Sequence, residues 1–127
     1  MTAYLDTNVL IRHLTGHPPK LARRSREILE SEGPLILTDV IVAECVYVLE
    51  SFYEVDRAEI VLLMRAATAL GSIVTPNIAV VRRSLELYED GHDFADSYLV
   101  ACAEASGVAV ASFDRAIDTI GTVERIG

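Results

Sequence analysis

Four acids stand at positions where a hydrophobic core would normally exclude charge: Asp6, Glu44, Asp96 and Asp114. The first and last of them each follow a short apolar run, and Glu44 is the only charged residue in the stretch 40–49. Asp96 lies among apolar and small residues. An ionised carboxylate without a partner in such a setting costs roughly several kcal/mol. The four positions therefore predict a functional site in which the acids serve one purpose.

The chemistry of such a site follows from its charge. Two like charges about 5 Å apart, at an effective dielectric constant of about 20, repel by about 3 kcal/mol. Helix dipoles offset only about 0.3–1 kcal/mol each. Converging carboxylates therefore need cations, and Mg²⁺ or Mn²⁺ prefer such oxygen ligands. These ions activate water and stabilise phosphate oxygens, which predicts hydrolysis of phosphate esters.

Each acid also has a purely structural interpretation. Asp93 and Asp96 are three residues apart, so they share one face of a helix, and either can cap its start. Asp6 and Asp114 can cap the helices that follow them, and Glu44 can form an ion pair with an arginine. The four acids together favour a common site, because several unpaired acids in apolar surroundings only destabilise a fold.

The elements that must position these acids alternate along the chain. Short apolar strands are expected at 3–5, 35–37, 72–74, 108–113 and 122–126. Helices are expected at 8–14, 21–31, 38 or 39 to about 53, 57–69, 78–88, 93 or 96 to about 107, and briefly from 115. This order predicts an α/β fold, a single-domain three-layer sandwich with a mostly parallel central sheet of about four to five strands flanked by helices. Sites in such sheets lie beyond the carboxyl ends of the strands.

The composition of the chain excludes some classes of function. The chain has 127 residues, of which 51% are hydrophobic, and this size suits one domain with a real core. Its apolar runs are too short to span a bilayer and its N-terminus has no basic segment, so a cytoplasmic location away from membranes is expected. The net charge of −8 argues against binding nucleic acid over the whole surface. Basic residues nevertheless cluster early in the chain: Arg12, Lys20, Arg23, Arg24 and Arg26.

Several segments together resemble a known family. The stretches DTNVL, DFADSYLVA and SFDRA, with the lone Glu44 between them, resemble a PIN domain. Their order and spacing are similar to the small VapC-type toxins of toxin–antitoxin pairs, and the resemblance covers residues 1–127. It implies an endoribonuclease that hydrolyses RNA phosphodiester bonds with a water activated by Mg²⁺, or by Mn²⁺ as a substitute. It also implies a homodimer held inactive by a small antitoxin protein.

The resemblance assigns roles to individual residues. The acids Asp6, Glu44, Asp96 and Asp114 match the family's catalytic residues and metal ligands, and Asp93 matches an additional ligand. Asn8 matches a residue that orients the first acid. Ser112 stands where threonine is usual, so a hydroxyl is retained, and Arg115 is a candidate for contact with substrate.

Other functions compete with this interpretation. A catalytically inactive PIN-like binding module would keep the fold and a partner surface, and a structure-specific DNA nuclease would keep the chemistry. A haloacid-dehalogenase-like phosphatase needs a second acid where this chain has Asn8, and a lysine near the site, whereas the only lysine is Lys20. The cluster from Lys20 to Arg26 can contact RNA phosphates or, equally, an acidic segment of an antitoxin.

Overall fold

The computed structural model describes all residues from Met1 to Gly127. The chain divides into two compact units, Met1–Asn77 and Ile78–Gly127, and each is described by itself. The acids of interest are shared between them. Asp6 and Glu44 belong to the first unit, and Asp93, Asp96 and Asp114 belong to the second.

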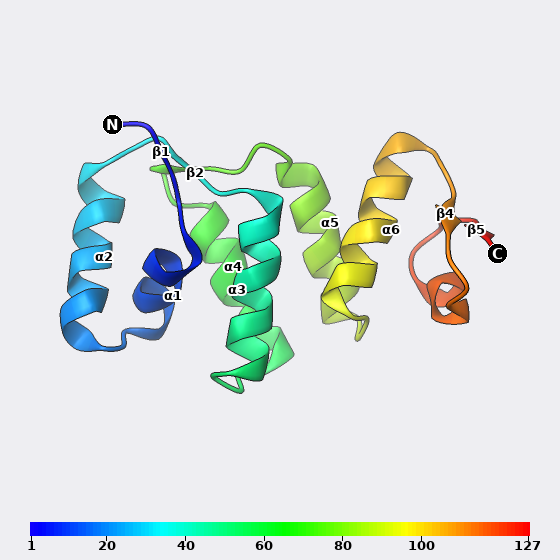
Figure 1. The fold of residues 1–127 in the computed structure, drawn as a ribbon, viewed down its shortest axis with the longest axis horizontal. Helices are drawn as coiled ribbons and strands as arrows, with labels where there is room; N and C mark the ends of the chain where they lie inside the picture. The colour runs from blue at the N-terminus through cyan, green and yellow to red at the C-terminus, as the bar shows by residue number, and fades with distance from the viewer. The chain divides into compact units, whose positions relative to one another are not determined.

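The first unit contains a parallel sheet of three short strands in the order β1-β2-β3 (Figure 1). Its elements are β1 (Ala3–Tyr4), α1 (Thr7–Thr15), α2 (Pro19–Ser31), β2 (Leu35–Ile36), α3 (Asp39–Ser51), α4 (Arg57–Thr68) and β3 (Ile73–Val74). Two helices connect each strand to the next, which gives the crossovers that parallel pairing requires. Helix α1 packs against both α2 and α3, and α3 packs against α4.

Local sequence explains where these helices begin and end. Gly16 ends α1 with a φ of 72°, a left-handed conformation that glycine adopts without steric cost. Pro19 is the first residue of α2, where its fixed φ and missing N–H suit a helix start. The hydroxyl of Thr38 accepts a hydrogen bond of 3.4 Å from the backbone N–H of Ile41 and so caps α3.

The core of the first unit is aliphatic. Its most deeply buried side chains come from three helices and from the segment of β2, and include Leu10, Leu35, Leu37, Val42, Leu49, Ile60, Val61 and Met64. Burying one such side chain contributes about 1.5–3 kcal/mol. The packed helices therefore hold the end of β1, which Asp6 follows, and the middle of α3, which carries Glu44, in a stable frame.

The second unit pairs two helices with a small parallel sheet. It contains α5 (Ile78–Glu89), α6 (Phe94–Ser106), β4 (Val110–Ala111), the 3₁₀ helix η1 (Arg115–Thr119) and β5 (Arg125–Ile126). Helices α5 and α6 pack against each other. The apolar core joins α5 and α6 to the C-terminal segment through Leu87, Val100, Ala103, Val110, Ile117 and Ile120.

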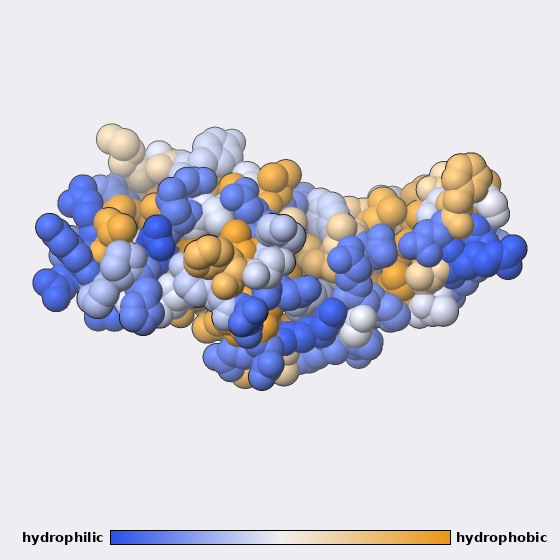
Figure 2. All heavy atoms as spheres, turned by 60° about the horizontal axis from the view of Figure 1, so that its bottom comes forward, coloured by the Kyte–Doolittle hydropathy of each residue, from blue (hydrophilic) through white to orange (hydrophobic).

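The expected α/β class with parallel strands is confirmed. Every predicted helix and strand is present, with boundaries that differ by only a few residues, and the five strands form a three-stranded and a two-stranded parallel sheet. Several large apolar side chains remain exposed, and Figure 2 shows such surface in orange between blue polar groups on the face it draws. None of the helices combines the length and the apolar character needed to cross a membrane.

Candidate functional site

A hollow of about 340 Å³ in the first unit brings two of the predicted acids together. Asp6, directly before α1, and Glu44, in the middle of α3, both line it. Asn8 and Arg12 extend the lining along α1, and their spacing of four residues places them on one side of that helix. The hollow therefore contains two carboxylates, an amide and a guanidinium.

The surroundings of Glu44 differ from the sequence-based expectation. The apolar neighbours of Glu44 predict a position within the hydrophobic core, but Glu44 is exposed, as are Val40 and Tyr47 on the same side of α3. The buried side chains of α3 include Val42 and Cys45, which face the core. Glu44 therefore lines an open hollow, and no salt bridge joins it to an arginine of its unit.

The pKa of the Cys45 thiol reflects the negative charge beside this hollow. Burial, together with the smaller effect of the negative charges of Glu44 and Asp6, raises its pKa to about 12. Both carboxylates therefore lie close enough to the thiol to act on it. A neutral thiol with so high a pKa is unreactive, so Cys45 serves as a core residue. The two cysteines are free; Cys45 is buried and Cys102 is partly buried.

Asp6 does not act as a helix cap. It occupies the N-cap position of α1, with a φ of −91°, yet its side chain accepts no capping hydrogen bond. The neighbouring residue Thr7 also lines the hollow and is 7% exposed, and its hydroxyl oxygen is buried without a hydrogen-bond partner. A buried polar atom without a partner is uncommon in proteins. The carboxylate of Asp6 is therefore not used to cap α1, and a neighbouring hydroxyl is unsatisfied.

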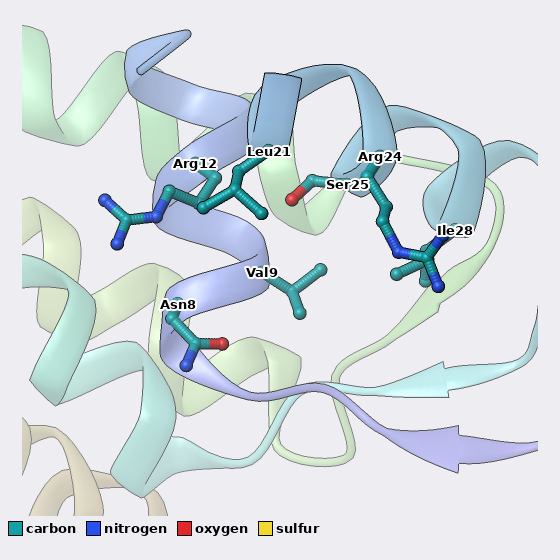
Figure 3. Close-up of a pocket in the computed structure, with 7 residues that line it drawn as sticks. All are labelled: Asn8, Val9, Arg12, Leu21, Arg24, Ser25 and Ile28. Carbon is teal, nitrogen blue, oxygen red and sulfur yellow. The ribbon is translucent and has the colours of Figure 1, made fainter. Parts of the chain in front are cut away.

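A second hollow of about 250 Å³ lies between α1 and α2 (Figure 3). Its lining is apolar at Val9, Leu21 and Ile28 and basic at Arg12 and Arg24. Figure 3 shows the guanidinium groups of the two arginines extending in different directions from this hollow. Asn8 and Arg12 border both hollows, so part of the early basic cluster lies beside the acids of the first unit.

The second unit gathers the other acids near the start of α6. Asp93 caps this helix, accepting a hydrogen bond of 3.4 Å from the backbone N–H of Asp96. Burial raises the pKa of Asp96, the charges of Asp93 and Asp114 raise it further, and His92 opposes them. Asp93 and Asp114 therefore each lie close enough to Asp96 to repel its carboxylate.

Asp114 is held in a tight turn after β4. Its backbone N–H donates a hydrogen bond of 2.9 Å to the hydroxyl of Ser112. One of its carboxylate oxygens accepts a bond of 2.9 Å from the N–H of Ala116, which caps η1. The hydroxyl at position 112 thus orients the turn that carries the acid. Arg115 follows with an exposed side chain.

The structure adds residues that the sequence pattern did not single out. Val48, Phe52 and Tyr53 complete the hollow that holds Asp6 and Glu44. Positions 44, 48 and 52 are spaced by four residues, so they lie along one side of α3 and its C-cap. The sequence contains this spacing. Only the packing of α1 against α3 shows that the three residues line a hollow.

The acids fit a divalent cation by chemical type. Every proposed ligand is a carboxylate, the donor that Mg²⁺ and Mn²⁺ favour. The structure shows no cluster of three or more His, Cys, Asp or Glu side chains arranged to hold a metal ion. What it shows is one pair of acids in the first unit and one group of three in the second.

Comparison with known proteins identifies one family. The model of the PIN domain family matches residues 3–122, and no curated protein matches the chain. The VapBC2 complex from Rickettsia felis, bound to a DNA fragment from its promoter, is a similar solved structure, with 14% identity, coverage of 99% of this chain and 98% of that chain, and a TM-score of 0.40. A toxin–antitoxin complex from Klebsiella pneumoniae is 17% identical, covers 90% of this chain and 87% of that chain, and has a TM-score of 0.35.

Proposed function

The chain belongs to the PIN domain family, whose members are generally nucleases, and on this premise we propose that it is a metal-dependent endoribonuclease acting as the toxin of a type II toxin–antitoxin pair. We treat residues 1–127 as one PIN domain, because the family match extends over both units of the chain. The proposal also includes a homodimer and a cognate antitoxin, both of which rest on the resemblance of the sequence to VapC-type toxins, and a cytoplasmic location.

One observation carries the proposal. Asp6, Glu44, Asp96 and Asp114 take part in no salt bridge, although each lies close to at least one other acid. A protein that needed these acids only for stability would neutralise them, since each unpaired repulsion raises the free energy of the folded state. Acids kept in this condition favour a cation as their partner, and Mg²⁺ or Mn²⁺ is the one we propose.

The residues of the chain have separate tasks in this proposal. Asp6 and Glu44 in the first unit and Asp93, Asp96 and Asp114 in the second are the proposed metal ligands, and a bound ion would supply an activated water and positive charge for the phosphate oxygens. Asn8 and Arg12 line the hollow beside Asp6 and can hydrogen-bond a phosphate or a ribose. Arg115 is exposed next to Asp114 and can contact a second phosphate.

The test is cleavage of total cellular RNA by purified protein, with Mn²⁺ or with EDTA. We expect wild type to cleave only with the metal. Asp6→Ala and Asp96→Ala should each lower the rate by about 100-fold or more, the scale on which a positioned catalytic group contributes. Asp90→Ala is the matched control, because Asp90 is an exposed acid outside both groups. It should cleave like wild type.

Three results would contradict the proposal. Undiminished cleavage by Asp6→Ala or Asp96→Ala would remove these acids from the site. Cleavage of duplex DNA in preference to RNA would favour the DNA nuclease. Absence of cleavage by folded wild type with Mn²⁺, together with binding of RNA or of a protein partner, would favour the catalytically inactive binding module.

A further inference from the structure

The hollow that holds Asp6 and Glu44 also contains an aromatic pair that the proposed chemistry does not use. Phe52 and Tyr53 line it at the end of α3. Their ring centroids are 5.0 Å apart and their planes meet at 71°, an edge-to-face arrangement. The side chain of Phe52 is 76% exposed, whereas Tyr53 is partly buried. Tyr53 thus supports a phenyl ring that projects into solvent at the border of the hollow.

The backbone holds this pair in place. The N–H groups of Phe52 and Tyr53 donate to the carbonyl oxygen of Val48 at 2.9 and 3.2 Å. Glu54 then has a φ of 52°, a left-handed conformation that turns the chain toward α4. The N–H of Val55 returns to the carbonyl oxygen of Leu49 at 3.0 Å. The two rings are therefore carried on a hydrogen-bonded turn and do not depend on a ligand for their position.

The groups around the hollow match the parts of an unpaired nucleotide. An exposed aromatic ring stacks on any base, since every base has a π-face. The guanidinium of Arg12 forms no salt bridge and lines the same hollow, so it is available to a phosphate. The amide of Asn8 can donate to and accept from a base edge or a ribose hydroxyl. A base within a duplex has both faces stacked already, so only a single strand can use this ring.

We propose that Phe52, supported by Tyr53, is a stacking platform for an unpaired base next to the scissile phosphate, with Arg12 binding the adjoining phosphate. This inference rests on the proposed ribonuclease function and adds to it the residues that hold a base and a phosphate beside the cleavage site. The apolar part of the hollow thus selects the structural state of the RNA, and the acids perform the reaction.

The experiment measures binding separately from cleavage. The probe is a single-stranded 12-nucleotide oligoadenylate with a central 2-aminopurine, and the protein carries Asp6→Asn in EDTA so that the probe stays intact. Stacking quenches 2-aminopurine fluorescence. In this background Phe52→Ala should weaken binding about tenfold and abolish the quench, while Phe52→Trp should retain both. Arg12→Gln should weaken binding and make it less dependent on salt.

Two controls distinguish stacking on Phe52 from a general effect of removing an apolar side chain and from binding to a duplex. Leu62→Ala removes another exposed apolar side chain, 60% exposed on α4 and outside the hollow, and should change nothing. The same probe annealed to oligouridylate should bind equally weakly to all variants. If Phe52→Ala binds like the parent, or if duplex and single strand bind alike, the inference is wrong. The exposed ring of Phe52 would then be interpreted as an apolar contact for a protein partner.

Cleavage by otherwise wild-type protein separates this inference from the proposed function. Loss of cleavage of a single strand in Phe52→Ala and its recovery in Phe52→Trp would support both proposals. If Asp96→Ala abolishes cleavage and Phe52→Ala leaves it unchanged, the ribonuclease proposal is supported and the stacking platform is refuted. If the fluorescence quench depends on Phe52 but the protein cleaves no RNA, the stacking platform is supported and the ribonuclease proposal is refuted.

Discussion

At the scale of single residues, Asp96 is the acid of the candidate site whose carboxylate pKa is raised. It is partly buried at the start of α6, and its pKa is raised first by burial and then by Asp93 and Asp114. A raised pKa means that the ionised form is less stable in the folded protein than in the unfolded chain. Asp96 therefore destabilises the fold at neutral pH when no cation is bound. A residue with a purely structural role would have the opposite effect.

This leads to a prediction about stability without metal. Asp96→Asn should increase the free energy of unfolding in EDTA at pH 7 by about 1 kcal/mol, because the amide removes the buried charge and its repulsion. Urea denaturation measures the change, with Asp90→Asn as the exposed control. A decrease of more than about 1 kcal/mol would instead assign Asp96 to the support of the fold.

At the scale of elements, Glu104 connects the parts of the second unit. Its carboxylate binds Arg83 of α5 at 2.7 and 3.2 Å and accepts hydrogen bonds from the N–H and hydroxyl of Thr122 at 2.9 and 3.1 Å. A Cβ at Gly121 would collide with this carboxylate, and the φ of 57° there also favours glycine. One acid thus joins α5, α6 and the turn before β5. The contacts with Arg83 and Thr122 lower its pKa to about 2.

The lowered pKa predicts a pH dependence of stability. Because the folded pKa of Glu104 lies below the unfolded value of 4.5, its contribution is complete above about pH 4.5 and is lost as the pH falls toward about 2. Glu104→Gln should lower the free energy of unfolding at pH 7 by about 2 kcal/mol, after allowance for the partial exposure of Arg83.

Urea denaturation at several pH values tests this expectation. The difference between Glu104→Gln and wild type should shrink between pH 4.5 and pH 2.5. A difference that stays constant over this range would show that the charge of Glu104 is not responsible.

At the scale of the whole molecule, the acids on which the proposal depends are contributed by both units, and the PIN family match spans both. A ligand that binds only the folded protein stabilises it by RT ln(1 + [L]/Kd), about 2.7 kcal/mol at 100 times Kd. Mn²⁺ should therefore raise the melting temperature by roughly 10 °C at that concentration.

Thermal unfolding of variants from each unit checks this prediction. Asp6→Asn in the first unit and Asp96→Asn in the second should each lose most of the increase, whereas Asp90→Asn should keep it. If both single variants retain the full increase, Mn²⁺ binds elsewhere and the acids have another role.

The sequence by itself determined the order of helices and strands, the parallel α/β class, the family and the positions of the acids after β1 and β4. These properties depend on the local periodicity of apolar residues, on capping and turn residues, and on short sequence motifs. Each of these can be recognised from residues that are neighbours in the sequence. The tertiary structure alone decided that Glu44 is exposed beside Asp6 and that Arg12 and Phe52 share their hollow. That depends on how α1 packs against α3, and packing is decided by the complementarity of whole surfaces, which no short stretch of residues encodes.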